Sequence, residues 1–224
     1  MKFLVNSLAA GAGTVIGTQV SLRVGQQRTP HPMPHQFASL LDHGLRLRYR
    51  DPLETLGLFG IAPGMTVLDL GCGTGLFTTA MARMVGPTGT VHAVDVQQPM
   101  LDATAARLAE ADLAQNVRLH HAGAYALPLP DASCDLAVVV ATLGEIPDRY
   151  AAMLELRRVL KPGARLAVSE ELPDPGYLSG RAVRTSAEEA GFRLKGKTGS
   201  FFCYHMVFVN SFATDDVVTG AVGF

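Results

Sequence analysis

Hydrophobic and polar positions along the middle of the chain follow a repeating order of strand, helix, strand. Short apolar runs bounded by glycine, proline and polar residues predict β-strands, and apolar residues at helical spacing predict the connecting helices. The expected strands are residues 67–70, 90–94, 117–121, 135–141 and 165–169, and the expected helices are residues 77–85, 99–111, 148–160 and 179–190. Strands that alternate with helices in this way form parallel βαβ units joined by right-handed crossovers. The predicted fold class is therefore α/β, a doubly wound sheet.

The last part of the pattern breaks this alternation. Residues 192–197 and 201–209 both have strand-like composition, and only "TGS" separates them. Three residues are too few for a helical crossover, so the two segments must form an antiparallel hairpin. A parallel sheet that ends in an antiparallel strand differs from the two matched halves of a dinucleotide-binding domain.

The N-terminal stretch has a different composition. Residues 3–22 carry no charge, and this stretch is long enough to suggest a membrane segment or a secretory signal. Its polar side chains and three glycines argue against both interpretations. Two interpretations stay open, a loosely ordered cytosolic segment and a segment that associates weakly with a membrane. "RTPHPMPH", residues 28–35, predicts an extended linker, followed by two short lid helices. The lid is expected to come from residues 30–60, with Phe37, Leu40, Leu41 and Tyr49, together with Phe201 or Phe202 of the terminal hairpin. We expect residues 1–50 to form an N-terminal segment, linker and lid helix, and residues 51–224 to form the main domain.

Composition excludes several classes of function. The 224 residues suffice for one domain with a full core, and the net charge of −1 is untypical of a nucleic-acid-binding protein. Three widely spaced cysteines without a CxxC pair predict neither a disulfide framework nor a zinc site, which favours a cytoplasmic protein. No grouping of histidine, cysteine and acidic residues has the spacing of a metal site, so no metal is expected.

The first predicted strand runs directly into a glycine-rich turn, "VLDLGCGTG", residues 67–75. In open α/β sheets ligands bind at the carboxyl ends of the strands, and Gly71, Gly73 and Gly75 leave backbone accessible there. Leu76 stands where a dinucleotide fingerprint has its third glycine, so no pyrophosphate cradle is predicted. Asp95 ends the second strand, where its carboxylate can accept both hydroxyls of a ribose. The pattern fits an adenosine without a pyrophosphate, although a tight strand-to-helix connection alone would also explain the glycines.

Four motifs in order carry a resemblance to a known family. "VLDLGCGTG", "VHAVDVQ", "LPLPDASCDLAVV" and "ELRRVLKPGARLAVSE", within residues 52–209, resemble the motifs of the class I S-adenosylmethionine-dependent methyltransferases. More narrowly, they resemble the branch that includes the ubiquinone/menaquinone-type methyltransferases. The resemblance implies a Rossmann-like sheet of seven strands in the order 3-2-1-4-5-7-6, with an antiparallel last strand and an N-terminal helical segment. It also implies S-adenosyl-L-methionine as the cofactor.

The resemblance assigns roles to individual positions. Asp69 resembles the acid beside the cofactor's amino group, the glycines line its methionine part, and Asp95 binds the ribose. Val96 and Gln97 lie near adenine. Cys72 is small filler inside the loop and not a nucleophile. The expected cofactor-binding residues are Asp69, Gly71, Cys72, Gly73, Gly75, Asp95, Val96, Gln97, Gly123 and Ala124.

One position departs from the family pattern. The usual "GDAxxLP" is "AGAYALP" here, residues 122–128, so Gly123 replaces an aspartate that accepts a hydrogen bond from the adenine amino group. The backbone amide of Ala124 can still donate to the ring. Loss of one hydrogen bond costs on the order of 0.5–1.5 kcal/mol, roughly a tenfold change in affinity. We therefore expect weaker cofactor binding that is not abolished.

Two acids are candidates for a general base. Glu145 follows the fourth strand, where burial could raise its pKa, although an acid at a helix start is the simpler interpretation. Glu170 ends the fifth strand beside Glu171, and solvent exposure is its alternative. In-line transfer from a sulfonium mainly requires the acceptor atom to be held about 3–3.5 Å from the methyl group.

The expected function is methyl transfer to a small, neutral or hydrophobic acceptor by in-line displacement. The alternative is a regulatory or partner protein that binds S-adenosylmethionine without catalysis, which the Gly123 departure favours. An NAD-dependent oxidoreductase is disfavoured by the glycine spacing and the terminal hairpin. We expect no nucleic-acid partner, weak membrane association through residues 1–30 as one option, and a monomer or homodimer. The acceptor and the methylated element are left open.

Overall fold

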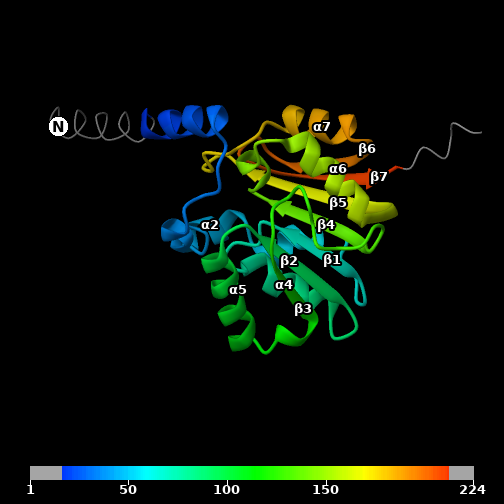
Figure 1. Cartoon of the computed structure of the whole chain (residues 1–224). Helices are drawn as coiled ribbons and strands as arrows, with labels where there is room; N and C mark the ends of the chain where they lie inside the picture. The colour runs from blue at the N-terminus through cyan, green and yellow to red at the C-terminus, as the bar shows by residue number, and fades with distance from the viewer. Residues whose placement is uncertain (1–16, 212–224) are drawn as a thin grey trace, which may run out of the picture.

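A single seven-stranded sheet organises the computed structural model, which describes residues 17–211. The strand order is β3-β2-β1-β4-β5-β7-β6, and β7 is antiparallel to both of its neighbours. Helices cover both faces of the sheet, with α6 and α7 on the side opposite α4 and α5 (Figure 1). The predicted fold class, strand order and terminal hairpin are confirmed.

Most element bounds lie within one or two residues of the predicted ones. The strands are β1 (Thr66–Leu70), β2 (Thr90–Asp95), β3 (Val117–His121), β4 (Cys134–Val140), β5 (Leu160–Glu171), β6 (Phe192–Gly199) and β7 (Cys203–Asn210). The α-helices are α2 (Gly44–Tyr49), α3 (Pro52–Gly57), α4 (Leu76–Val85), α5 (Gln98–Glu110), α6 (Arg149–Val159) and α7 (Gly180–Glu189). Short 3₁₀ turns are η1 (His35–Leu40), η2 (Ala114–Asn116) and η3 (Leu143–Glu145).

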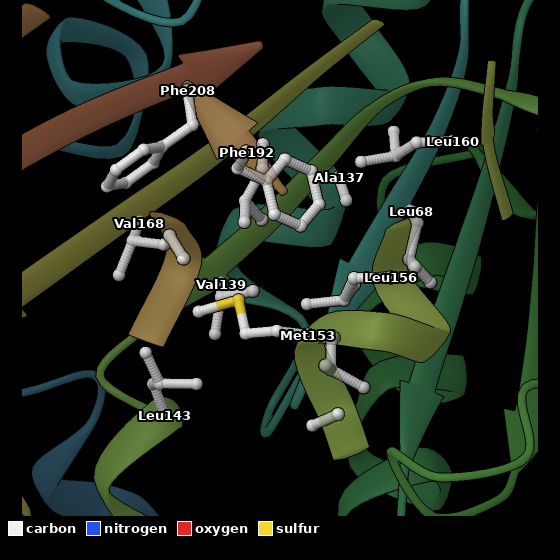
Figure 2. Close-up of a cluster of buried hydrophobic side chains, with 14 of the residues drawn as sticks. Leu68, Ala137, Val139, Leu143, Met153, Leu156, Leu160, Val168, Phe192 and Phe208 are labelled. Carbon is white, nitrogen blue, oxygen red and sulfur yellow. The ribbon is translucent and has the colours of Figure 1, made fainter. Parts of the chain in front are cut away.

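Two hydrophobic clusters hold the layers together. Met153 and Leu156 of α6 pack with Phe192 and Phe208 of the terminal hairpin on one face of the sheet (Figure 2). On the other face, α3, α4 and α5 contribute a second cluster that includes Met81. Parallel strands buried on both faces consist of continuous apolar runs, which is why β4 shows no polar alternation over its central residues.

The N-terminal segment differs from the expectation of loose order. Residues 17–28 form a helix that turns polar side chains toward the domain. The Arg23 guanidinium donates to the carbonyl oxygens of Leu172 and Asp174, and it lies 5.3 Å from the centre of the Tyr177 ring. Such tertiary contacts stabilise a helix that its glycines alone would not. The loosely ordered interpretation is therefore wrong for this stretch, whereas the N-terminal helical segment that the resemblance implied is confirmed. Residues 1–16 lie outside the described part.

Strand β5 is longer than predicted at its start. The predicted strand began at residue 165, after "KPG" at residues 161–163, but the observed strand begins at Leu160, which pairs with Cys134 of β4. The pairing register shifts just after this point, an irregularity of the kind that tolerates proline in a sheet. The Asn210 side-chain amide donates to three carbonyl oxygens at this strand start, those of Arg157, Leu160 and Lys161. The end of β7 therefore fixes the start of β5.

No helix between residues 17 and 211 combines the length and the apolar character that crossing a bilayer requires.

Leu156→Ala tests the core of the α6 face. Leu156 is fully buried, so the truncation should lower the free energy of unfolding by about 2–5 kcal/mol. Leu154 lies on the same helix and is 41% exposed, so Leu154→Ala should change it by less than about 1 kcal/mol. Urea denaturation of both variants measures the difference, and equal losses would contradict the assignment of this core face.

Candidate active site

A cavity of about 200 Å³ lies at the carboxyl ends of β1, β2 and β4. Its lining includes nine of the ten predicted cofactor-binding positions, namely Asp69, Gly71, Cys72, Gly73, Asp95, Val96, Gln97, Gly123 and Ala124. Gly75 is not among the lining residues, because it forms the N-cap of α4 behind the turn. The sheet topology thus brings three separate sequence motifs to one place.

The glycine turn after β1 depends on its lack of side chains. Gly71 has φ of 76°, and a Cβ atom there would lie 2.3 Å from Thr142 in the loop after β4. Gly73 has φ of 54°, in the left-handed region that glycine adopts most easily. These positions let the loops after β1 and β4 approach each other, which closes the floor of the cavity.

Two carboxyl groups tie the floor to its neighbours. Asp95 accepts hydrogen bonds from the backbone N–H groups of Gly73, at 3.0 Å, and Gln97, at 2.9 Å. Asp69 accepts a hydrogen bond of 2.6 Å from the Thr78 hydroxyl. Burial raises the pKa of Asp69 to about 7, and the nearby charge of Asp95 adds to this. Burial also raises the pKa of Asp95, although its backbone hydrogen bonds oppose the shift.

The two candidate bases occupy different environments. Glu145 ends η3 and lines the cavity, and its pKa is raised to about 8 by burial and by the charges of Asp174 and Asp95. Glu170 is fully buried and is not among the lining residues. It accepts a hydrogen bond from the backbone N–H of Leu178, and burial raises its pKa to about 8. The expected solvent-exposed alternative for Glu170 is wrong, because this end of β5 is covered.

The wall expected to hold adenine has free space at Gly123, the position that departs from the family motif. A Cβ atom on Gly123 would meet only Val96, at 3.9 Å, so the backbone there has room for a side chain. Tyr125 also lines this part of the cavity, and its hydroxyl accepts a hydrogen bond of 2.9 Å from the backbone N–H of Asp148. Cys72 is buried, which raises the pKa of its thiol above the ordinary value, as expected for filler.

A buried charge network beside the cavity was not predicted. Arg46 lines the cavity and donates a 2.7 Å hydrogen bond to Glu171, whose carboxylate also pairs with Arg50 at 3.1 Å. Arg50 donates to the Ser169 hydroxyl at 2.7 Å, and that hydroxyl contacts Nδ1 of His205 at 2.8 Å. Burial lowers the pKa of His205 to about 4, so the ring is neutral. The only sequence signal was the spacing of Arg46, on α2, and Arg50, just after its end, because residues four apart share one side of a helical turn.

The lid differs in detail from its prediction. Leu41 lines the cavity as expected, but the predicted lid residues Phe37, Tyr49 and Phe202 are exposed and are not among the lining residues. Tyr49 instead packs against Phe202 with ring centres 5.2 Å apart. The linker itself, through Pro32 and Met33, supplies the cover that the apolar pattern had assigned to aromatic side chains.

Sequence comparison places these motifs among known proteins. A family model described as a methyltransferase domain matches residues 67–163. A demethylmenaquinone methyltransferase of Listeria monocytogenes is 37% identical over 136 residues, 61% of this chain and 56% of the relative. A ubiquinone/menaquinone biosynthesis C-methyltransferase of Shewanella halifaxensis is 39% identical over 116 residues, 52% of this chain and 46% of the relative. The chain spans about half the length of these curated relatives.

Structural comparison extends the match to most of the chain. A crystal structure of a SAM-dependent methyltransferase from Aquifex aeolicus superposes with a TM-score of 0.74 and 29% identity, covering 80% of this chain and 99% of that one. Residues 67–163 thus match a methyltransferase family model, and most of the chain has the fold of a SAM-dependent methyltransferase. The structure of the [4+2]-cyclase SpnF also matches, with a TM-score of 0.59 and 25% identity over 66% of this chain and 57% of that one. Membership of this fold therefore does not by itself settle the reaction.

These matches confirm the predicted resemblance to the class I S-adenosylmethionine-dependent methyltransferases. The matched model begins at the first residue of the glycine motif and ends at the glycine of "KPG", so it includes the loops after β1, β2 and β4. Within residues 17–211, no group of three or more His, Cys, Asp or Glu side chains is arranged to hold a metal ion.

Glu170→Gln tests the buried carboxyl at the end of β5. A pKa raised to about 8 in the folded state, against 4.5 ordinarily, means that the folded protein holds this proton more tightly. Stability should therefore fall as the pH rises from about 5 to 8, by up to roughly 1.4 kcal/mol per pH unit from this group. The variant should show a shallower fall.

The same denaturation series with Glu189→Gln is the control, because Glu189 is exposed on α7. That variant should keep the wild-type slope between pH 5 and 8. A Glu170→Gln slope equal to that of the wild type would contradict the shift assigned to Glu170.

Proposed function

We propose that this protein transfers the methyl group of S-adenosylmethionine to a small, neutral or hydrophobic acceptor. One observation carries the proposal: three carboxyl groups, Asp69, Asp95 and Glu145, share one small cavity, and all three have raised pKa values. A ligand that brings a positive charge favours their ionised forms. S-adenosylmethionine carries an ammonium group and a sulfonium, and its sulfonium methyl is the electrophile of the reaction.

The residues present fit this cofactor. Asp95 lines the cavity, and each of its carboxylate oxygens accepts one backbone N–H, which leaves acceptor capacity on both oxygens for the two ribose hydroxyls. Asp69 lies below the glycine turn, and Gly71, Cys72 and Gly73 leave the backbone free to contact the methionine part. We assign the adenine to the wall that includes Val96, Gln97, Gly123 and Ala124, and Gly75 acts through the turn that it closes.

The acceptor class follows from the other side of the cavity. Leu41, Phe77 and Ile146 give this side an apolar lining, and the single cation on it, Arg46, is already paired with Glu171. An apolar wall favours a neutral or hydrophobic ring over a charged polymer. The names of the relatives, which refer to demethylmenaquinone and to ubiquinone/menaquinone biosynthesis, support a quinol-like acceptor for this chain as well.

Glu145 is the better placed of the two candidate bases. It lines the cavity, whereas the carboxyl of Glu170 is enclosed behind it and can act on an acceptor only through other groups. With a pKa of about 8, Glu145 exchanges a proton near neutral pH, as a general base for a phenolic hydroxyl or an activated ring carbon requires. Catalysis otherwise consists of holding the acceptor in line with the methyl group and excluding water.

Calorimetric titration and a transfer assay test the proposal. The wild-type protein should bind S-adenosylmethionine and not NAD, and it should move a labelled methyl group to a member of a panel of quinols, phenols, thiols and lipids. Binding without transfer to any class would favour the non-catalytic alternative. Tight NAD binding without a response to S-adenosylmethionine would refute the proposal.

Asp95→Ala tests the assigned ribose contact. Loss of hydrogen bonds to a charged acceptor costs about 1.5–3 kcal/mol, so affinity for S-adenosylmethionine should fall roughly 10- to 100-fold. Asp102→Ala is the matched control, because Asp102 lies on α5 outside the cavity lining and accepts a hydrogen bond from Gln98. Calorimetry should find the control at the wild-type affinity, and an unchanged affinity in Asp95→Ala would remove the assignment.

Gly123→Asp should improve cofactor binding. The substitution restores the acid of the family motif at a position with space for it, since the nearest atom to a new Cβ is 3.9 Å away. One regained hydrogen bond to adenine is worth on the order of 0.5–1.5 kcal/mol, so the dissociation constant should fall by roughly tenfold. Gly123→Ala controls for the added Cβ. Equal affinity in the two variants would show that adenine does not lie against this wall.

A further inference from the structure

The proline-rich segment between the N-terminal helix and η1 crosses the cavity. We call residues 30–34 the strap, and two of them, Pro32 and Met33, line the cavity. Figure 1 shows the blue chain running from the N-terminal helix past the strand ends to α2. Pro30, Pro32 and Pro34 restrict the backbone to extended conformations, so the strap is stiff.

Both backbone groups of Met33 face side chains of the cavity. The Gln97 side-chain amide donates a 2.8 Å hydrogen bond to the Met33 carbonyl oxygen. The Met33 N–H lies near enough to the carboxylate of Glu145 to favour its ionised form. The three prolines have no backbone N–H, so Met33 and His31 carry the only two backbone N–H donors in the strap.

The two partners of Met33 come from opposite sides of the glycine turn. Gln97 follows β2 and Glu145 ends η3 after β4, while β1 lies between these strands. A segment fastened to both must cross above the carboxyl end of β1, where Gly71 and Gly73 form the cavity floor. Leu41, on the chain after the strap, also lines the cavity close to Gly73.

The strap is anchored more firmly at its two ends than at Met33. Upstream, Arg23 binds two carbonyl oxygens of the loop after β5, and Gln26 donates to the His31 carbonyl at 2.6 Å. Downstream, Asp42 pairs with Arg107 and accepts a 3.0 Å hydrogen bond from Thr74. Release of Met33 alone would therefore free the middle of the strap while both ends stay attached.

The volume of the cavity indicates that Met33 must be released before a ligand can enter. Sites for small molecules typically measure about 300–1,000 Å³, and the strapped cavity measures about 200 Å³. A ligand of the size of S-adenosylmethionine needs more room than this partly covered arrangement provides. Movement of the middle of the strap is the smallest change that enlarges the cavity, since the floor is the short glycine turn fixed between β1 and α4.

We propose that Gln97 and Glu145 are positioning residues that fasten the strap over the cofactor cavity through Met33, and that release of Met33 admits and discharges the cofactor. The inference rests on the proposed function for the identity of the ligand. It gives Gln97 a role toward the chain itself in addition to the adenine. Glu145 has two carboxylate oxygens, so one can hold Met33 while the other faces the acceptor.

Met33→Pro against Met33→Ala isolates the strap. Both variants lose the side chain, but only proline removes the N–H that faces the Glu145 carboxylate, and residue 33 already precedes a proline and favours extended backbone. With labelled S-adenosylmethionine and rapid filtration, Met33→Pro should show association and dissociation rates that are both roughly tenfold faster than those of Met33→Ala. The dissociation constant should differ by less than about threefold, because an opened gate speeds both directions.

A contact with the cofactor would behave differently. Its loss would raise the dissociation rate and the dissociation constant together and leave association unchanged. That outcome, or equal rates in the two variants, would overturn the proposal. Thermal unfolding of both variants should coincide, which separates a released strap from a damaged fold.

Amide hydrogen exchange without the cofactor is the second measurement. Gln97→Leu should speed exchange of the Met33 N–H roughly tenfold, whereas Gln98→Leu, at the exposed neighbouring position, should leave it at the wild-type rate. Equal exchange in both variants would overturn the fastening. If the wild-type protein does not bind S-adenosylmethionine, the proposed function fails, and this exchange result alone decides whether Gln97 holds the strap.

Discussion

Burial of a parallel sheet on both of its faces is the constraint on which the rest of this structure depends. Two hydrophobic clusters cover the two faces, so the central strands β1 and β4 are buried along almost their whole length. The loops that follow these strands are free to carry polar and flexible residues, and parallel strands bring their carboxyl ends to one edge. The glycine turn after β1 and the acids after β2 and β4 meet there for this reason. The site is a consequence of the way the core is built.

Negative charge at that edge is left without a cationic partner inside the cavity and is neutralised by arginine beside it. Asp69, Asp95 and Glu145 are held with raised pKa values inside the cavity, which costs stability unless a cation is bound. Beside the cavity, Arg46 and Arg50 neutralise Glu171 through two ion pairs that join the lid to β5. Removal of one partner of such a pair leaves an uncompensated buried charge. The cavity carboxyls are therefore suited to bind a cationic ligand, whereas the ion pairs of Glu171 hold the lid in place.

The N-terminal segment shows how far tertiary contacts can override local preference. Its helix contains Gly17 and Gly25, and propensity alone argued against it. Hydrogen bonds from Gln19 and Arg23 to the loop after β5 hold it against the domain, and they continue into the strap through Gln26. The segment that composition marked as separate is thus fixed to the domain and joined to the strap that lines the cavity. A polar inner face is invisible to an analysis of apolar periodicity.

Local sequence determined the strands, the helices and the closing hairpin, because each depends on neighbouring residues. It also predicted ten cofactor positions from short motifs, and nine of these line the cavity. It did not distinguish Glu145 from Glu170, since both are acids at strand ends and only packing shows that one reaches the cavity and the other is enclosed.

Tertiary structure alone decided the partners of Met33 and the pairing of Arg50 with Glu171, contacts between residues that lie far apart in the chain. No periodicity records such contacts, because they depend on where the folded sheet places each loop. The sequence therefore determined which ligand the floor suits, and the folded chain decided how the cavity is covered.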